Sequence, residues 1–179
     1  MDTTDRARFT IAIGSLLALV ILLVVLAGNQ PGTQTTMHNG DVLGKQEEET
    51  FQQYQDRATR TLEGQGERFA LITFQQPLSP TSTEQTLEPI GRVNAVVLDS
   101  SAPLALPEPV APEGRADVIR RYQSFAGAKD APLQAAVVRE ELLTLRELAA
   151  QPDIAAIEAL PDDAAWGHFG ITLVRAPAA

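Results

Sequence analysis

The sequence predicts an α+β fold in which one membrane-spanning helix precedes a single exported domain. One apolar run near the N-terminus contains no charged residue and is long enough to cross a bilayer. Beyond it, short runs rich in β-branched residues alternate with stretches whose apolar residues recur every three or four positions, a mixture typical of strands and helices. Pro and Gly separate these stretches, so each element can be placed along the chain.

The predicted transmembrane helix is residues 9–27, FTIAIGSLLALVILLVVLA. At about 1.5 Å per residue this run makes a helix of roughly 28 Å, close to the ~30 Å hydrocarbon core of a bilayer. Gly14 and Ala18 lie one helical turn apart with Ser15 beside them, so another membrane helix could approach closely on this side. The ordinary composition of a lone anchor explains the same residues equally well.

The basic residues predict the orientation of this single-pass helix. Arg6 and Arg8 are the only basic residues near either end, so the positive-inside rule keeps residues 1–8 in the cytoplasm. The main domain is then extracytoplasmic, and the expected location is the cell membrane. Val25-Leu26-Ala27 is also typical of a signal-peptidase site. A retained signal-anchor is preferred over cleavage because the apolar run is long and the basic region thin.

Composition restricts what the exported part can bind. The chain of 179 residues carries 23 acidic and 14 basic residues, a formal net charge of −9, and nearly all of both kinds follow the predicted span. This charge opposes binding to nucleic acid and to anionic lipid headgroups. The sequence contains no cysteine, which excludes disulfides, thiolate catalysis and sulfur-ligated metals.

The residue motifs point away from catalysis. The sequence contains no Gly-x-Ser-x-Gly elbow, phosphate-binding loop, dinucleotide fingerprint or haem-attachment motif. Its two histidines, His38 and His168, are far apart in the chain, and His168 is interpreted as a strand-end residue. Asp162-Asp163 is interpreted as a turn rather than as a pair of catalytic carboxylates. The chain is therefore predicted not to be an enzyme and to bind no cofactor or metal.

The exported part begins with a tether and a helix. Residues 28–40 are uncharged and rich in Gly and Thr, the composition of a flexible tether, so the domain is assigned to residues 41–179. From 45 to 63 the apolar residues recur at helical spacing, with the acidic residues 47–49 in the expected first turn. The apolar, partly β-branched run 68–74 then predicts a buried strand.

A proline break at Pro77 is expected to end this strand. Ser79 and Pro80 can start a short helix that continues to Leu87, with Pro at the first helical position. The run 92–98, RVNAVVL, is the second predicted strand.

The next segment combines an extended excursion with a helix. Four prolines between 103 and 112 predict a stiff surface segment. Asp117 could then cap a helix that continues to Ala126.

The stretch 131–160 has two interpretations. As one helix, apolar residues at alternating spacings of four and three form an unbroken stripe from 131 to 149. As strand, helix and strand, it divides into 134–139, 140–150 and 154–160. The second interpretation is preferred because it respects the break at Pro152 and the β-branched pair Val137-Val138.

With that choice the element order becomes strand, helix, strand, inserted helix, strand, helix, strand. This is the βαββαβ plan of a ferredoxin-like domain with an insertion at its centre. Such a fold buries one sheet face under two helices, so the other face must be covered by the remaining elements or by another protein. A last apolar run, 169–174, would add an edge strand or offer a strand to a partner.

Two segments resemble known domains. The segment 145–158 resembles the closing helix and strand of the ferredoxin-like propeptide and inhibitor modules of subtilisin-like proteases, which supports the fold more than any activity. Its matching residues are Leu145, Leu148, Pro152, Ile154, Ile157 and Glu158. The segment 69–80, with FALITF followed by PLSP, looks like the opening of small anchored domains of unassigned function in actinobacteria.

The layout of the whole chain predicts a subunit. A short inner tail, one helix and a small outer domain make it similar to accessory subunits of the actinobacterial cytochrome bcc–aa3 respiratory supercomplex. This resemblance implies a non-catalytic accessory or scaffolding subunit that docks on a larger integral membrane complex. The expected partners are that complex and, through the anchor, the lipid bilayer. The alternative is a free-standing exported binding module, either protease-inhibitor-like or a small-ligand sensor.

Overall fold

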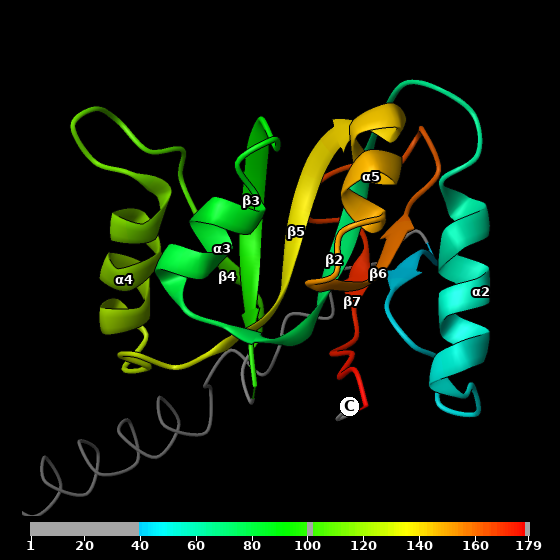
Figure 1. Cartoon of the computed structure of the whole chain (residues 1–179), viewed down its shortest axis with the longest axis horizontal. Helices are drawn as coiled ribbons and strands as arrows, with labels where there is room; N and C mark the ends of the chain where they lie inside the picture. Colours follow the sequence, from blue (N-terminus) through cyan, green and yellow to red (C-terminus); the bar gives the residue numbers. More distant parts are fainter. Residues whose placement is uncertain (1–39, 100–101, 178–179) are drawn as a thin grey trace, which may run out of the picture. The chain divides into compact units, whose positions relative to one another are not determined.

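The computed structural model describes residues 40–99 and 102–177, which form an α+β domain (Figure 1). Within these residues, no helix has both the length and the apolar character needed to cross a membrane. The predicted transmembrane helix 9–27 lies outside the described residues, and so do its packing residues Gly14, Ser15 and Ala18.

The described domain contains four helices and two sheets. In chain order the elements are β1 (Val42–Leu43), α2 (Phe51–Thr61), β2 (Glu67–Leu78), α3 (Pro80–Thr86), β3 (Arg92–Leu98), β4 (Leu104–Ala105), α4 (Arg115–Phe125), β5 (Leu133–Glu141), α5 (Leu142–Ala149), β6 (Ile154–Ala159) and β7 (Gly170–Ile171). Five strands form one sheet in the order β4-β3-β5-β2-β6, with every neighbouring pair antiparallel. β1 and β7 form a separate parallel pair.

The strand, helix, strand interpretation of residues 131–160 is confirmed. β5, α5 and β6 occupy this stretch, and β5 lies between β3 and β2 in the sheet. Because β5 is internal, its side chains are buried on both faces, from Ala135 to Val138. That continuous burial explains why the stretch lacks the alternation that would have identified a strand.

Two further elements agree closely with the sequence. β3 has the predicted bounds, Arg92–Leu98. α3 begins at Pro80, and the Ser79 hydroxyl oxygen accepts a hydrogen bond from the backbone N–H of Ser82 at 3.1 Å. A capping side chain followed by Pro at the first helical position was the signal that predicted this helix.

The predicted start of the first exported helix was wrong. α2 begins at Phe51, so the acidic residues 47–49 precede the helix. The Thr50 hydroxyl oxygen accepts from Gln53 N at 3.2 Å, and the Gln53 side-chain oxygen accepts from Thr50 N at 2.8 Å. This reciprocal capping satisfies free N–H groups at the helix start and fixes it there.

Two other predicted boundaries were also wrong. β2 continues to Leu78 through Pro77, because this end of the strand lies in an irregular part of the ladder: β5 has no register partner for β2 between Thr73 and Leu78. α4 begins at Arg115 rather than after Asp117. The Asp117 carboxylate lies in the first turn and accepts from the backbone N–H of Gly114 at 3.2 Å.

The last apolar run does not extend the main sheet. Within 169–174 only Gly170–Ile171 is a strand, and it pairs with β1. β6 is an edge strand of the main sheet, and α2 covers this edge. The Gln55 side-chain amide donates to Ala155 O at 2.8 Å, and the Thr61 hydroxyl accepts from Ala159 N at 2.8 Å. These contacts occupy edge groups of β6 that would otherwise be available to an added strand.

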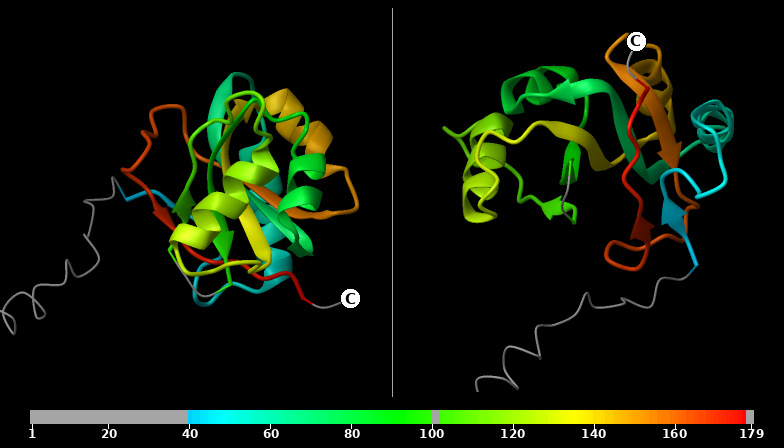
Figure 2. Two further views of the ribbon diagram at one scale, coloured as in Figure 1. Left: turned by 90° about the vertical axis from the view of Figure 1, so that its left-hand side faces the viewer. Right: turned by 90° about the horizontal axis from the view of Figure 1, so that it is seen from below.

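The two faces of the sheet are covered by different parts of the chain (Figure 2). On the first face, apolar side chains of α3, α4 and α5 form one core with the sheet. On the second face, α2, β1 and the segment around β7 form another core with it. The second face is therefore covered by the beginning and the end of the described chain, within the same domain.

Candidate functional site

The second face of the sheet holds the two arrangements of polar and aromatic side chains that are candidates for function. One is a cluster around the buried carboxylate of Glu158, which we call the Glu158 cluster: the charged residues Glu49, Arg57 and Glu158 and the backbone of Gly44. The other is a surface hollow, which we call the Trp166 groove: Glu67, Arg68, Phe69, Arg139, Asp162 and Trp166.

The Glu158 cluster joins the N-terminal part of the domain, around β1 and α2, to the distant strand β6. Glu158 lies on β6 with only 4% of its side chain exposed, and one of its oxygens accepts from the backbone N–H of Gly44 at 2.6 Å. Its other oxygen pairs with a terminal nitrogen of Arg57 on α2. Arg57 also donates to both oxygens of Glu49, at 2.9 and 3.0 Å, and to Gly44 O at 3.0 Å. One guanidinium therefore bridges two carboxylates and a backbone carbonyl.

Gly44 is the position where only glycine fits this cluster. Its φ of +111° lies in the left-handed region, and a Cβ built there would be 2.3 Å from the carbonyl oxygen of Thr172. Thr172 N in turn donates to Leu43 O at 2.7 Å. The close approach of these two backbones depends on the missing side chain.

Ion pairing and burial shift the pKa values of Glu49, Arg57 and Glu158 in this cluster. The hydrogen bonds from Arg57 lower the pKa of Glu49, and the same bonds raise the pKa of Arg57. The pKa of Glu158 is raised, because burial disfavours its ionised form more than Gly44 and Arg57 favour it. Every charged group here already has a protein partner, so the cluster functions as a structural clamp that holds β1 and α2 on the sheet.

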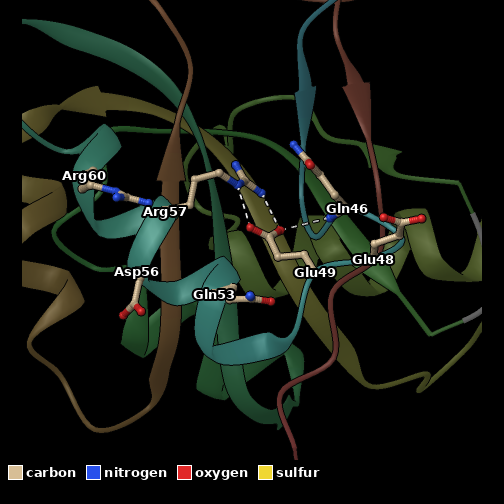
Figure 3. A pocket seen from close by; sticks show the side chains of 7 residues that line it. All are labelled: Gln46, Glu48, Glu49, Gln53, Asp56, Arg57 and Arg60. Carbon is tan, nitrogen blue, oxygen red and sulfur yellow. Dashed lines mark hydrogen bonds and ion pairs between the residues drawn. The ribbon is translucent and has the colours of Figure 1, made fainter.

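A hollow of about 420 Å³ lies beside this clamp, lined by Gln46, Glu49, Asp56, Arg57 and Arg60 (Figure 3). The dashed lines in the figure run from Arg57 to Glu49 and from Glu49 to Gln46, whose backbone N–H donates to the carboxylate at 3.1 Å. The Arg57 guanidinium and the Glu49 carboxylate in this hollow are therefore already paired with each other.

The Trp166 groove has a different character. It encloses about 340 Å³ between the start of β2, the end of β5 and the loop that follows β6. The Phe69 ring lies 6.0 Å from Trp166 and 5.4 Å from Phe169, centroid to centroid, and the two loop rings are 5.9 Å apart. Phe69 and Phe169 hold Trp166 in place, and 41% of the surface of Trp166 remains exposed.

Four charged side chains, two of each sign, surround the aromatic rings of the groove. Arg139 pairs with Glu67 at 3.2 Å, and Arg68 lies 4.0 Å from Asp162. The Arg139 guanidinium also lies 5.7 Å from the centre of the Phe69 ring. The rim thus offers both donors and acceptors with no net charge.

Trp166 also lines a second hollow, of about 300 Å³. It is lined mainly by apolar residues, among them Ala95, Pro103, Phe169 and Ile171. Trp166 is therefore shared by a hollow with a charged lining and a hollow with a mainly apolar lining.

The residues singled out from the sequence have mixed outcomes. Asp162 and Asp163 form the predicted turn, and Asp162 also lines the groove. His168 lies just before β7 on the exposed loop, where its backbone N–H donates to Ala165 O at 3.0 Å. Within the described residues, no group of three or more His, Asp or Glu residues is placed to hold a metal ion.

Sequence reasoning missed both candidate sites, for different reasons. The Glu158 cluster depends on the pairing of Arg57 with a residue in a distant strand, which no local pattern reveals. The groove had one local signal: Trp166 and Phe169 lie close together in a stretch rich in Gly, Pro and Asp, where exposure of a large aromatic ring is expected. None of the family models, curated proteins and solved structures compared with this chain matches it.

Proposed function

We propose that the chain is a membrane-anchored, non-catalytic binding module whose outer domain binds its ligand at the Trp166 groove. The observation that carries this proposal is the groove itself: a partly exposed Trp residue, held by two Phe rings, that lines two hollows, one of which has four charged side chains in its lining. Concave sites that combine aromatic surface with a few placed polar groups are the usual form of ligand sites.

The strand order supports the finer proposal that the core is a ferredoxin-like domain. Without β4 and α4, the order is β2, α3, β3, β5, α5, β6 along the chain and β3-β5-β2-β6 across the sheet. This is the split βαβ arrangement, with β4 and α4 as the insertion. The clamp then joins elements outside this core, α2 and the chain after β1, to β6, whereas the groove lies between the core strands β2 and β5 and the loop after β6.

The covered second face favours a free-standing module over an obligate subunit. The sequence left open whether one sheet face is covered by the remaining elements or by another protein, and whether the last apolar run adds an edge strand or pairs with a partner. In the described domain, Tyr54 and Ala58 of α2 cover part of that face, and the apolar run supplies Phe169 and Val174 to the same core. Folding of this domain therefore requires no partner surface there.

The accessory-subunit role is the second candidate. Phe125 at the end of α4 exposes 78% of its surface and packs edge-on against Tyr122, and α4 covers the other face of the sheet from the groove. An exposed aromatic residue at such a helix end is typical of protein contacts. The respiratory supercomplex whose accessory subunits share the layout of this chain is the first complex to test.

Two measurements on the full chain distinguish these candidates. A photo-crosslinking residue placed at Ala165, in the groove, should form adducts in intact cells, whereas one placed at Phe125 should not. After gentle extraction the chain should migrate near its own mass. Migration with a large complex, together with adducts at Phe125 alone, would instead establish the subunit. Replacing Gly14 and Ala18 by Leu should then weaken that association, because close helix packing is lost.

A further inference from the structure

The Trp166 groove has the features of a carbohydrate platform. Hexose rings present C–H groups on one face, and these pack against the electron-rich face of an aromatic ring. Trp166 supplies such a ring, and its contacts with Phe69 and Phe169 hold it in place before any ligand arrives. A preformed platform lowers the entropy lost on binding.

The balance of charge around the ring indicates a neutral, hydroxyl-rich ligand. Each sugar hydroxyl both donates and accepts hydrogen bonds, and the rim provides guanidinium donors and carboxylate acceptors in ion pairs. An acidic or basic ligand would need unpaired charge of the opposite sign, whereas Arg139 and Glu67 already neutralise each other. A purely apolar peptide would have to cover charged groups without satisfying them, which is unfavourable.

The second hollow indicates that the ligand is longer than one sugar unit. A chain stacked on Trp166 can place one unit beside Arg139 and Asp162 and the next against Pro103 and Ile171. The two hollows, of about 340 and 300 Å³, each have Trp166 in their lining.

We propose that the groove binds a neutral oligosaccharide that stacks on Trp166 and is oriented by the Arg68–Asp162 and Arg139–Glu67 pairs. This inference rests on the proposed function and assigns a ligand class to the same site. It commits to glycan rather than to peptide, because the rim offers hydrogen bonds of both kinds without net charge.

The chain offers a built-in probe for this proposal. Trp166 is its single tryptophan, so intrinsic tryptophan fluorescence reports on the groove alone. The full chain would be reconstituted in phosphatidylcholine vesicles, since detergents with sugar headgroups would compete for the site. Cellotetraose, maltotetraose and tetra-N-acetylchitotetraose would be titrated separately to about 10 mM, the range of weak specific binding. At least one should produce a saturable shift, unchanged by added salt because the ligand carries no charge.

Three variants test whether the shift comes from the groove. Asp162→Asn and Arg139→Gln keep the tryptophan and should weaken binding about three- to tenfold. Trp166→Ala, followed by calorimetry, should weaken it more than tenfold. Phe125→Ala, an exposed aromatic on α4, is the matched control and should bind as wild type. Circular dichroism checks that each variant is folded.

The inference is overturned if no oligosaccharide gives a saturable change in wild type, or if Asp162→Asn, Arg139→Gln and Trp166→Ala all bind as wild type does. Protein adducts at Ala165 in cells, without any glycan response, would overturn the ligand class while leaving the binding module in place. Absence of both adducts and response would remove the proposed function as well.

Discussion

The two faces of the sheet are built by different means. On the first face, regular helices from the middle of the chain bury Leu142, Leu145 and Leu148 against the strands, and the polar residues buried on these helices, among them Thr83 and Gln123, are uncharged. On the second face, the two ends of the described chain provide the cover, and a buried carboxylate paired with a partly exposed guanidinium holds it in place. The candidate ligand groove lies on this second face.

The first face therefore contributes mainly to the stability of the fold, and the second face requires one specific arrangement of its side chains. Apolar burial stabilises a fold without requiring one exact arrangement, whereas a buried ion pair is favourable only when its partners are correctly placed. We therefore expect damage to the first face to be global. Damage to the second face should be local and, at the Glu158 cluster, should depend on pH.

The largest effect is expected at Leu145, which is fully buried on the first face. Leu145→Ala should lower the free energy of unfolding by about 3 kcal/mol or more, because the cavity adds to the lost burial. Urea unfolding of the full chain in vesicles measures this. Hydrogen exchange should accelerate in the whole main sheet; acceleration confined to α5 would contradict a single cooperative core.

Arg57→Met should cost about 3 kcal/mol at pH 7, because it leaves the carboxylate of Glu158 buried without its cation. The pKa of Glu158 is already raised by burial, and loss of Arg57 should raise it further. When the pKa of a group is raised in the folded state, protonation of that group stabilises the fold. This contribution is present in full below the ordinary pKa of 4.5 and is lost as the pH rises through the folded-state pKa. The deficit of this variant should therefore shrink as pH falls from 7 towards 5.

Two observations control this prediction. Glu158→Gln combined with Arg57→Met should remove the pH dependence, because no buried carboxyl remains to take up a proton. A constant deficit between pH 5 and 7 in Arg57→Met alone would show that loss of packing, and not the stranded charge, causes the damage.

Gly44→Ala should cost about 2 kcal/mol, because the added Cβ would clash with the Thr172 carbonyl at a positive φ. The effect should be local: exchange should accelerate in β1 and β7 while β5 keeps its protection. Gly127→Ala is the matched control, since Gly127 also has a positive φ, but a Cβ there would meet no atom within 4 Å. If both variants are destabilised equally, the cost arises from the positive φ and not from a clash with Thr172.

The smallest effect is expected for Glu49→Gln, about 1 kcal/mol or less at pH 7. Arg57 lowers the pKa of Glu49, so the ion pair contributes fully above the ordinary value of 4.5 and is lost as pH falls through the lowered folded value. The difference in unfolding free energy between wild type and variant should disappear at low pH. A difference that grows on acidification would reverse the assigned direction.

The sequence predicted the elements whose signals are local. β3 lies between Gly91 and Asp99, and α3 begins at Ser79-Pro80, so turn and capping residues mark both. The division of 131–160 followed from the break at Pro152 and from the β-branched pair Val137-Val138. These signals operate over a few residues and need no tertiary contact.

What was missed depends on tertiary contacts. The extension of β2 through Pro77 follows from the irregular register with β5, and the pairing of β7 with β1 follows from contacts between the chain ends. The Arg57–Glu158 pair exists only because β6 and α2 lie side by side. A lone Arg and a lone Glu in a sequence are normally solvated, so nothing at either position predicted burial.

The parallel pairing of β1 and β7 has a mechanical consequence for an anchored domain. If tension reaches the domain ahead of Gly40 and is opposed at the Trp166 loop, both strands are pulled from adjacent ends. The pair then unzips, and the bond from Gly170 N to Asp41 O opens before the bond from Thr172 N to Leu43 O. Peeling stops at Gly44, where Glu158 and Arg57 hold the backbone. The domain would therefore yield in two stages: the β1–β7 pair opens first, as a short compliant segment, and the attachment at Gly44 resists further extension.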